Sequence, residues 1–216
     1  QVLVAGAGRI RHHPVDALGG RAGVLHRQML EGLLAHLRVS RARVEQVVAG
    51  FAVRFDRHWT GQLRAKLGLA AEEPDDRALA DDFLQLLQRE KVDFTLAFRL
   101  LSDAITGPDA ALHDLFGRER PALSDWLARW RQRMAREGRT LQDCAATAWS
   151  VNPFVIPRNH QVEAALSSAV DEADLGPFER LLAVLGRPYE TVESARPFTL
   201  PASPEVAAAH RTFCGT

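Results

Sequence analysis

The stretch VLHRQMLEGLLAHL, residues 24–37, gives a clear indication of the fold class of this chain. Its apolar residues recur at spacings of three and four, which is the period of one face of an α-helix. The face consists of Val24, Leu25, Met29, Leu30, Leu33, Leu34 and Leu37. The stretch therefore predicts an amphipathic helix, and the same signal recurs in the residues that follow it.

A second helix is expected directly after the first. Ser40 can cap its start and Gly68 can end it, because serine favours the N-cap and glycine the position after the last turn. Between them the helical spacing continues through Val44, Val47, Val48, Phe51, Phe55, Trp59, Leu63 and Leu67. After a loop at residues 70–74, Asp75 can cap a third helix. The residues that this helix would bury are Leu79, Phe83, Leu86 and Leu87.

Three more helices are each marked by a residue that begins or ends them. Residues 92–105, VDFTLAFRLLSDAI, predict one that ends at Gly107 and Pro108. Ser124 and Thr140 can cap the next two. Helical signals thus extend to about residue 150 without an intervening strand pattern.

Prolines organise the rest of the chain. Those in VNPFVIPRN, residues 151–159, predict a rigid bend, since proline fixes its own φ and restricts the residue before it. A helix is expected over residues 158–174, and Pro177 opens the last one. Four prolines after Arg187 predict an extended tail.

These signals predict an all-α fold, a helical bundle with an irregular N-terminal segment. Five of the first 23 residues are glycine, against 15 in the whole chain of 216 residues. We therefore divide the chain into three parts. They are an irregular, glycine-rich segment (1–23), a helical domain (24–190) and an extended, proline-rich tail (191–216) that ends in Cys-Gly-Thr.

Charge and composition narrow the class of partner and the compartment. The 27 basic and 27 acidic residues cancel, so no global field attracts nucleic acid or an anionic membrane. No apolar run approaches the roughly 20 residues that span a bilayer. Two cysteines are too few for a disulfide scaffold. We expect a cytoplasmic protein that binds neither nucleic acid nor membrane.

The opening VLVAGAGRI, residues 2–10, resembles the start of a dinucleotide-binding turn. However, the third glycine position holds Arg11, and the histidines and proline after it replace the expected helix. The interpretation that we prefer is a flexible N-terminal segment. A nucleotide oxidoreductase that uses Gly6 and Gly8 stays a minor alternative.

Histidines and common catalytic motifs give no complete site. The chain has eight histidines, but none forms the paired HExxH spacing of a zinc site. His12 and His13 are adjacent, and three others lie on expected helices: His26, His36 and His58. We find no GxSxG, no phosphate-binding loop and no kinase signature. We therefore expect no metal ligand and no catalytic residue in this chain.

Arginines surround two tryptophans in residues 126–139, an arrangement that can hold single-stranded nucleic acid. Trp126, Leu127, Trp130 and Met134 also follow the spacing of a buried helix face. Because the total charge is zero, we prefer a core stripe with the arginines as its solvated face.

The two cysteines differ in their surroundings. Cys144 lies among alanines on an expected helix and is interpreted as a small core residue. Cys214 lies near the end of the extended tail, where a thiol is more open to redox chemistry. From the residues alone, a redox role for Cys214 and an unreactive exposed thiol are about equally supported.

Five runs of sequence together resemble one family, in the same order along the chain. They are QLRAKLGL (62–69), VDFTLAFRLLSDA (92–104), NPFVIPRNHQVEAAL (152–166), PFERLLAVLGRPY (177–189) and RTFCGT (211–216). They resemble the C-terminal half of the selenoprotein O family, also called YdiU-like proteins, over residues 25–216. The most specific is NP-x-x-x-x-RN-x-x-x-E, from Asn152 to Glu163.

The resemblance implies a fold and a reaction. The family has a protein-kinase-like fold, and its members transfer AMP from ATP to Ser, Thr or Tyr hydroxyls of proteins, using Mg²⁺ or Mn²⁺. Its nucleotide-binding, metal-binding and catalytic residues precede the matched region, so none is carried over. The resemblance therefore implies an adenylyltransferase fragment, a pseudokinase-like C-lobe that is inactive alone. ATP and the metal are expected to need the rest of the family's sequence.

Two sets of partners follow from these interpretations. As part of an adenylyltransferase, the chain would meet protein substrates or a missing N-terminal kinase-like half. The alternative is a stand-alone, all-helical protein-interaction domain.

Within the specific motif, we expect Asn152, Arg158 and Asn159 to be structural, because polar side chains at a bend can satisfy unpaired helix-end groups. Contact with a substrate is the alternative role for these three residues.

The resemblance also bears on Cys214. Some family members end in a cysteine or selenocysteine at this place, and in bacterial forms the thiol can pair with a cysteine of the activation segment. Residues 1–23 contain no such cysteine, so this switch would be broken here.

We expect Cys214 to react with a thiol reagent before Cys144 does, and both thiols to be free. A thiol on an extended tail is more accessible than one on a packed helix face. Labelling of the native protein, followed by peptide mass analysis, measures the order. Equal or faster modification of Cys144, or a bridge between the two cysteines, would contradict it.

Overall fold

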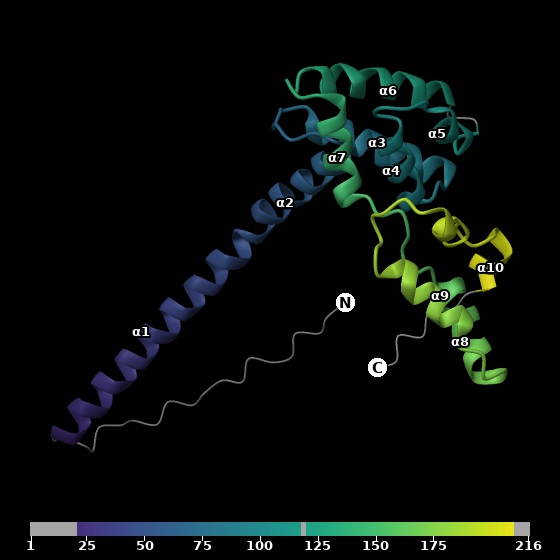
Figure 1. Cartoon of the computed structure of the whole chain (residues 1–216). Helices are drawn as coiled ribbons and strands as arrows, with labels where there is room; N and C mark the ends of the chain where they lie inside the picture. The colour runs from purple at the N-terminus through teal and green to yellow at the C-terminus, as the bar shows by residue number, and fades with distance from the viewer. Residues whose placement is uncertain (1–20, 118–119, 210–216) are drawn as a thin grey trace. The chain divides into compact units, whose positions relative to one another are not determined.

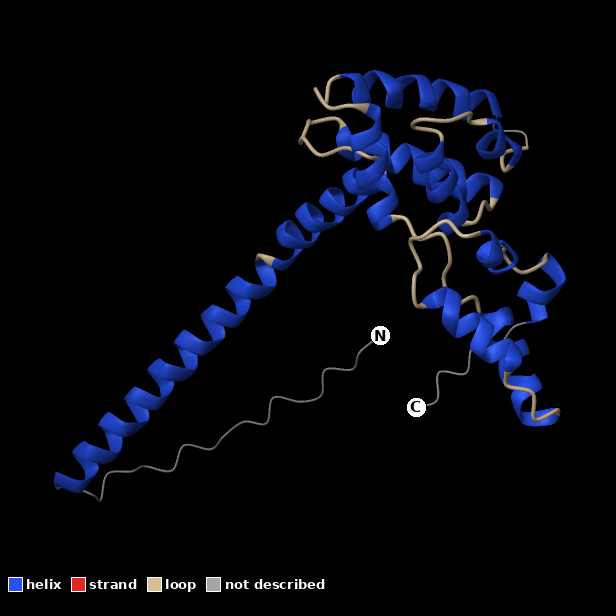
Figure 2. Cartoon of the chain, viewed as in Figure 1, coloured by secondary structure: helices blue, strands red, loops and turns tan. Residues whose placement is uncertain are grey.

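The computed structural model describes residues 21–117 and 120–209, and within these ranges the secondary structure is helical, without strands (Figures 1 and 2). The all-α prediction is confirmed. The elements in order are α1 (Arg21–Ala49), α2 (Phe51–Lys66), α3 (Asp76–Glu90), α4 (Phe94–Asp103), α5 (Ala110–Asp114), α6 (Arg120–Ala135), α7 (Leu141–Val151), α8 (Asn159–Asp171), α9 (Gly176–Leu185), the 3₁₀ helix η1 (Glu193–Phe198) and α10 (Pro204–Ala209). None of the described helices is long and apolar enough to cross a membrane.

The chain divides into two compact units, Gln1–Phe55 and Asp56–Thr216. In the first unit, every described side chain of α1 from position 28 onward is exposed. In the second, α3 packs against α6, and α4 packs against α5 and α7, while α8 and α9 lie side by side (Figure 1). The expected boundaries at residues 23 and 190 stay a prediction.

The first helix is longer than expected. Ser40 does not cap a second helix, because α1 runs through it to Ala49. An interior serine costs a helix little, and Arg41 stabilises the following turn by pairing with Glu45 at 2.8 Å. The interruption is Gly50, a residue with low helix propensity, and the next helix starts directly after it.

The core of the second unit is an aromatic stack between α3, α4 and α6. The ring of Phe83 stacks on Trp126 with centroids 4.4 Å apart, and meets Phe98 edge to face at 5.1 Å. Both tryptophan indoles donate to backbone carbonyls: Trp126 Nε1 to Leu79 O at 2.8 Å and Trp130 Nε1 to Leu67 O at 2.9 Å. The core interpretation of the tryptophan stripe is confirmed, since Trp126, Leu127, Trp130 and Met134 are all buried.

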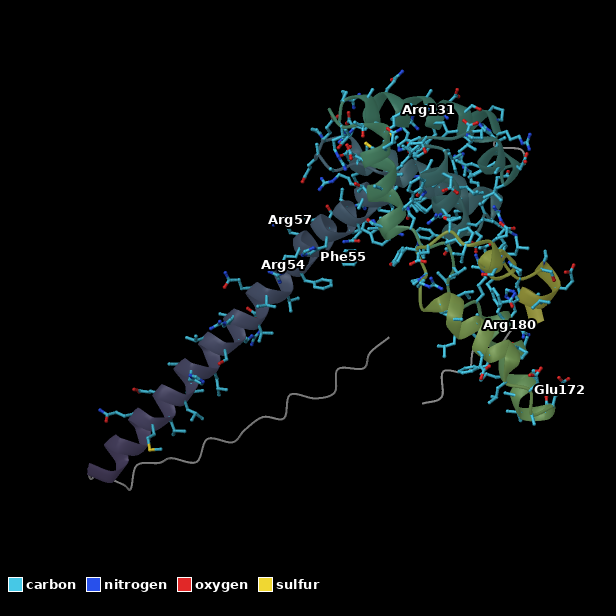
Figure 3. The ribbon with its side chains drawn as sticks, viewed as in Figure 1. Arg54, Phe55, Arg57, Arg131, Glu172 and Arg180 are labelled. Carbon is cyan, nitrogen blue, oxygen red and sulfur yellow. The ribbon has the colours of Figure 1, made fainter. Side chains whose placement is uncertain are left out.

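Arg133 corrects the expectation that all arginines of α6 face solvent. Arg133 is 3% exposed, and its guanidinium lies 2.6 Å from Asp76 of α3 and 2.7 Å from Glu137. It also donates to Ala71 O at 2.8 Å. A buried guanidinium is tolerated only when carboxylates and carbonyls surround it, and here they fix the loop of residues 70–75. Its neighbour Arg131, labelled in Figure 3, does face solvent and pairs with Asp109, the N-cap residue of α5.

Several helix boundaries also differ from expectation. Helix α6 begins at Arg120 and not at Ser124, with a proline in its first turn. Helix α4 ends at Asp103, before Gly107. The tail is not extended throughout, because η1 and α10 form within it. Proline fits the first turn of a helix, and Pro204 opens α10 in this way.

Other boundaries are confirmed. Thr140 caps α7 by accepting a hydrogen bond from Asp143 N at 3.1 Å, and a proline lies in the first turn of α9. Gly68 ends α2 with a φ of +76°, a left-handed conformation that favours glycine. A Cβ built there would lie 2.9 Å from Ile105 Cδ1 and 3.0 Å from the carbonyl oxygen of Cys144. Only glycine therefore fits both the backbone and the space.

We expect Gly68→Ala to lower the free energy of unfolding by more than about 2 kcal/mol. The left-handed backbone accounts for about 1 kcal/mol of this, and the contacts with Ile105 and Cys144 for the rest. The matched control is Gly138→Ala, because Gly138 has a φ of +65° but a Cβ added there would meet nothing within 4 Å. Urea unfolding of both variants measures the difference, and equal losses would show that packing plays no part.

Candidate functional site: residues 152–159

The segment NPFVIPRN, residues 152–159, connects α7 to α8 and is held by backbone bonds to a distant part of the chain. Phe154 N and Val155 N both donate to Pro188 O, at 2.7 and 3.1 Å. Val155 is 1% exposed. The bend is therefore a packed structural connection, and its two prolines restrict the backbone further because each fixes its own φ.

Asn152 joins the C-terminal ends of two helices. Its side chain is buried, and Nδ2 donates to Lys66 O, at the last residue of α2, at 2.8 Å. The same amide nitrogen donates to Ser102 Oγ of α4 at 2.9 Å. Asn152 Oδ1 in turn accepts from Lys66 Nζ at 3.1 Å. One amide thus satisfies a helix-end carbonyl that α2 cannot satisfy itself.

Lys66 makes the reciprocal contact, with the C-terminal end of α7. Its Nζ donates to the carbonyl oxygen of Val151, the last residue of α7, at 3.1 Å. A cation at a helix C-terminus is favourable because the carbonyl dipoles point towards it. The ammonium also lies 5.4 and 5.5 Å from the ring centroids of Phe94 and Phe98. Burial lowers the pKa of Lys66.

Arg99 of α4 is a second buried cation behind the bend. Its guanidinium donates to Asn152 O and to Tyr189 O, each at 3.2 Å, and also to the hydroxyl of Thr191. The nearest carboxylate is Asp103, whose Oδ1 lies 3.6 Å from Arg99 Nε. Burial lowers the pKa of Arg99, and the charge of Asp103 opposes that effect. Carbonyl oxygens therefore stabilise this cation more than a carboxylate does.

Arg158 fixes the other end of the bend. Its two terminal nitrogens contact both oxygens of Asp93 at 2.9 Å, a bidentate pair, and Nη2 also donates to Thr199 O at 2.8 Å. Asp93 is the N-cap of α4 and accepts from Leu96 N at 2.8 Å. Burial raises the pKa of Asp93, but the hydrogen bonds from Arg158 and Leu96 outweigh it, so the pKa lies below 3.8.

Asn159 differs from its two neighbours in the motif. It is exposed, begins α8, and lines an open pocket of 430 Å³ together with His160, Asp93, Pro201 and Val206. Arg158 also contributes to the lining of this pocket, and contact of the motif with a substrate stays a prediction. A second open pocket of 470 Å³ lies between α8, α9 and η1, where Arg180 and Glu172 contribute to its lining (Figure 3).

The other cysteine, glycine and histidine candidates from the sequence lie outside this segment. Cys144 is buried and free, and burial raises the pKa of its thiol. Cys214, Gly6, Gly8, His12 and His13 lie outside the described residues. Among the described residues, no group of three or more His, Cys, Asp or Glu side chains could hold a metal ion.

Sequence reasoning missed the residues that surround Asn152 and Arg158. Lys66 and Arg99 lie within two of the runs that resemble the family, but their contacts could not be predicted, because each pairs with groups more than 50 positions away. Asp93 was detectable, since an aspartate directly before an apolar helix is a common N-cap.

Comparison with known proteins identifies the family. The model of the family described as protein adenylyltransferase SelO matches residues 23–186. The chain belongs to the SelO family. The prediction made from the five sequence runs is therefore confirmed.

Relatives in this family carry the name protein nucleotidyltransferase YdiU. The protein from Rhizobium etli strain CIAT 652 is 42% identical over 176 residues, which is 81% of this chain and 35% of the relative. Those from Rhodococcus jostii and Bradyrhizobium sp. are 42% and 44% identical, over 80% of this chain and 33% and 35% of their own lengths. The chain thus spans about a third of the length of the SelO relatives that it matches.

We expect Arg158→Ala to lower the free energy of unfolding by about 3 kcal/mol at pH 7, because it leaves the half-buried Asp93 carboxylate without its cationic partner. The pKa of Asp93 is depressed in the folded state, so its contribution is present above pH 3.8 and is lost as the pH falls through the folded pKa. The variant should lose less stability over that acid range than the unsubstituted chain. Chemical unfolding at a series of pH values measures both effects.

The matched control is Arg187→Ala, which removes an exposed arginine 3.4 Å from Glu190 and should cost less than about 0.5 kcal/mol. Equal losses for the two variants would contradict a structural role for Arg158. The substrate-contact alternative is tested in a full-length SelO relative, where the matching arginine would be replaced by alanine. Lost activity with an unchanged melting temperature would favour it.

Proposed function

We propose that this chain is the C-terminal helical part of a SelO-type protein adenylyltransferase and that it does not transfer AMP alone. Membership of the family, over about a third of the relatives' length, carries this proposal. In the reaction, a protein Ser, Thr or Tyr hydroxyl would accept AMP from ATP, and pyrophosphate would leave. The helices of the second unit would form the lower C-lobe of a kinase-like fold.

The contacts of the buried cations support a proposal that places the ATP–metal site elsewhere in the family's sequence. A triphosphate needs clustered cations or backbone N–H groups, and a bound Mg²⁺ needs carboxylate or amide oxygens. The buried cations here already contact protein groups: Lys66 bonds to Val151 and Asn152, and Arg133 lies between Asp76 and Glu137. The described residues contain no metal-binding cluster. We therefore assign the nucleotide and metal to the region of the family that lies outside the match.

The proposed role of this chain is to give that region a rigid base. The bend at residues 152–159 fixes the ends of α2, α4 and α7 relative to one another through Asn152, Lys66 and Arg99. A catalytic site needs side chains held to within about 0.5 Å, and rigid elements beneath it provide this. Protein substrates would meet the complete enzyme and not this part alone.

The alternative function is a stand-alone protein-interaction domain. The observation in its favour is the run of exposed apolar side chains along α1. The interaction-domain alternative predicts that the chain acts without the rest of a SelO sequence. The adenylyltransferase proposal predicts that the chain can replace the corresponding part of an active relative.

We expect the 216-residue chain to show no ATP binding at micromolar concentration in calorimetry with Mg²⁺, and no transfer of label from ATP labelled at the α-phosphate. We expect a chimera, in which residues 23–186 replace the matching region of the Rhizobium etli relative, to transfer the label to protein. The intact relative is the positive control. Micromolar ATP binding by the chain alone would contradict the proposal. A folded chimera that transfers no label to protein would also contradict it.

A further inference from the structure

The longest described helix exposes an apolar face. Along α1, Leu30, Leu33 and Leu37 are 49%, 62% and 56% exposed, and Val44 and Val48 continue the row at similar exposure, followed by Phe51 at the start of α2. The face reaches Phe55 on α2, whose ring Figure 3 labels and which stacks on Phe51 with centroids 5.9 Å apart. Isolated surface leucines need no explanation, but a continuous row of this length marks an interaction surface.

The width of the face favours a globular partner over a paired helix. A coiled-coil seam needs apolar residues at two positions in every seven. A helix that faces a globular core has apolar residues at three positions in every seven. Here Leu33 and Leu34 are both apolar, as are Val47 and Val48, which widens the stripe beyond a seam. The charged residue inside it is Arg41, which pairs with Glu45 at 2.8 Å.

We propose that this face of α1 is the docking surface for the remaining two thirds of a SelO-type polypeptide, the part that lies outside the family match. The inference rests on the proposed function. It names that part, and neither a second copy of this chain nor an unrelated protein, as the occupant.

Two observations select this occupant. The family match begins at residue 23, so nearly the whole of α1 belongs to the sequence that SelO proteins share. In the Rhizobium etli relative the matched region is 35% of the protein, so most of that polypeptide is available to cover the helix within one chain. An apolar helix face that large would not stay solvated in a complete protein, because burying it is favourable at about 25 cal/mol per Å².

Two valines of α1 provide a matched pair of variants. Val48 lies within the face and is 66% exposed, and Val39 is 67% exposed. The two are nine residues apart, and at about 100° per residue they point to opposite sides of the helix. Val48→Glu therefore places a carboxylate within the proposed interface, and Val39→Glu makes the same chemical change on the other side.

The experiment compares both variants in the 216-residue chain and in the Rhizobium etli chimera. We expect Val48→Glu to lower the melting temperature of the chimera by several degrees and Val39→Glu to leave it unchanged, because only the first buries a charge. In the chain alone, the two variants should behave alike. Equal effects in the chimera would overturn the proposal. So would a large effect of Val48→Glu in the chain alone, since it would mean that the chain covers the face itself.

Two further measurements keep the proposal testable if the chimera does not fold. The tagged chain is co-expressed with the unmatched region of the Rhizobium etli relative. Capture of that region should fall at least about tenfold with Val48→Glu and persist with Val39→Glu. Equal capture would overturn the proposal, and so would light scattering that shows a dimer of the chain alone that Val48→Glu dissociates. Label transfer by the chimera tests the proposed function separately, since a stable chimera without transfer would leave the docking surface intact.

Discussion

The second unit depends on an exchange of hydrogen bonds between two helix ends. Asn152 donates to the last carbonyl of α2, and Lys66, which carries that carbonyl, donates to the last carbonyl of α7. Each helix thus supplies the cap that the other lacks, and the amide of Asn152 extends the network to Ser102 of α4. Unpaired carbonyls at buried helix ends cost about 1–3 kcal/mol each, so this junction stabilises the meeting of three helices by pairing the last carbonyls of two of them.

Around this junction the chain stabilises buried charge mainly with oxygens from its backbone. Arg99 donates to two carbonyl oxygens, and Arg158 adds a third, from Thr199, to its bidentate pair with Asp93. Carbonyl oxygens do not titrate. These cations therefore keep their partners over a wide range of pH, and the bend they hold stays rigid wherever the carboxylate of Asp93 remains ionised.

The helices could be predicted from the sequence, but this junction could not. Local signals such as Thr140 as an N-cap and Gly68 as a helix end are determined by their immediate neighbours, and the structure agrees with them. Asn152 and Lys66 are 86 positions apart, and no periodicity connects them. Arg133 shows a related limit: its spacing, three residues after Trp130 and seven after Trp126, places it on the buried face of α6, but its charge favours an exposed position. Its burial is determined by Asp76, 57 positions earlier. Ser40 shows the opposite error, because a residue that can cap a helix was given more weight than the strong helical pattern on both sides of it.

Helix α6 carries two kinds of ion pair, and these respond differently to ionic strength. Arg129 and Arg131 pair with Asp82 and Asp109 at the surface, where dissolved ions at physiological concentration screen charges over about 8 Å. The pair of Arg133 and Asp76 is enclosed, with side chains 4% and 1% exposed, so dissolved ions do not reach it. Added salt should therefore loosen the rim of α6 and leave its attachment to the 70–75 loop unchanged. The helix thus combines salt-sensitive ion pairs at its surface with one salt-insensitive pair in its interior.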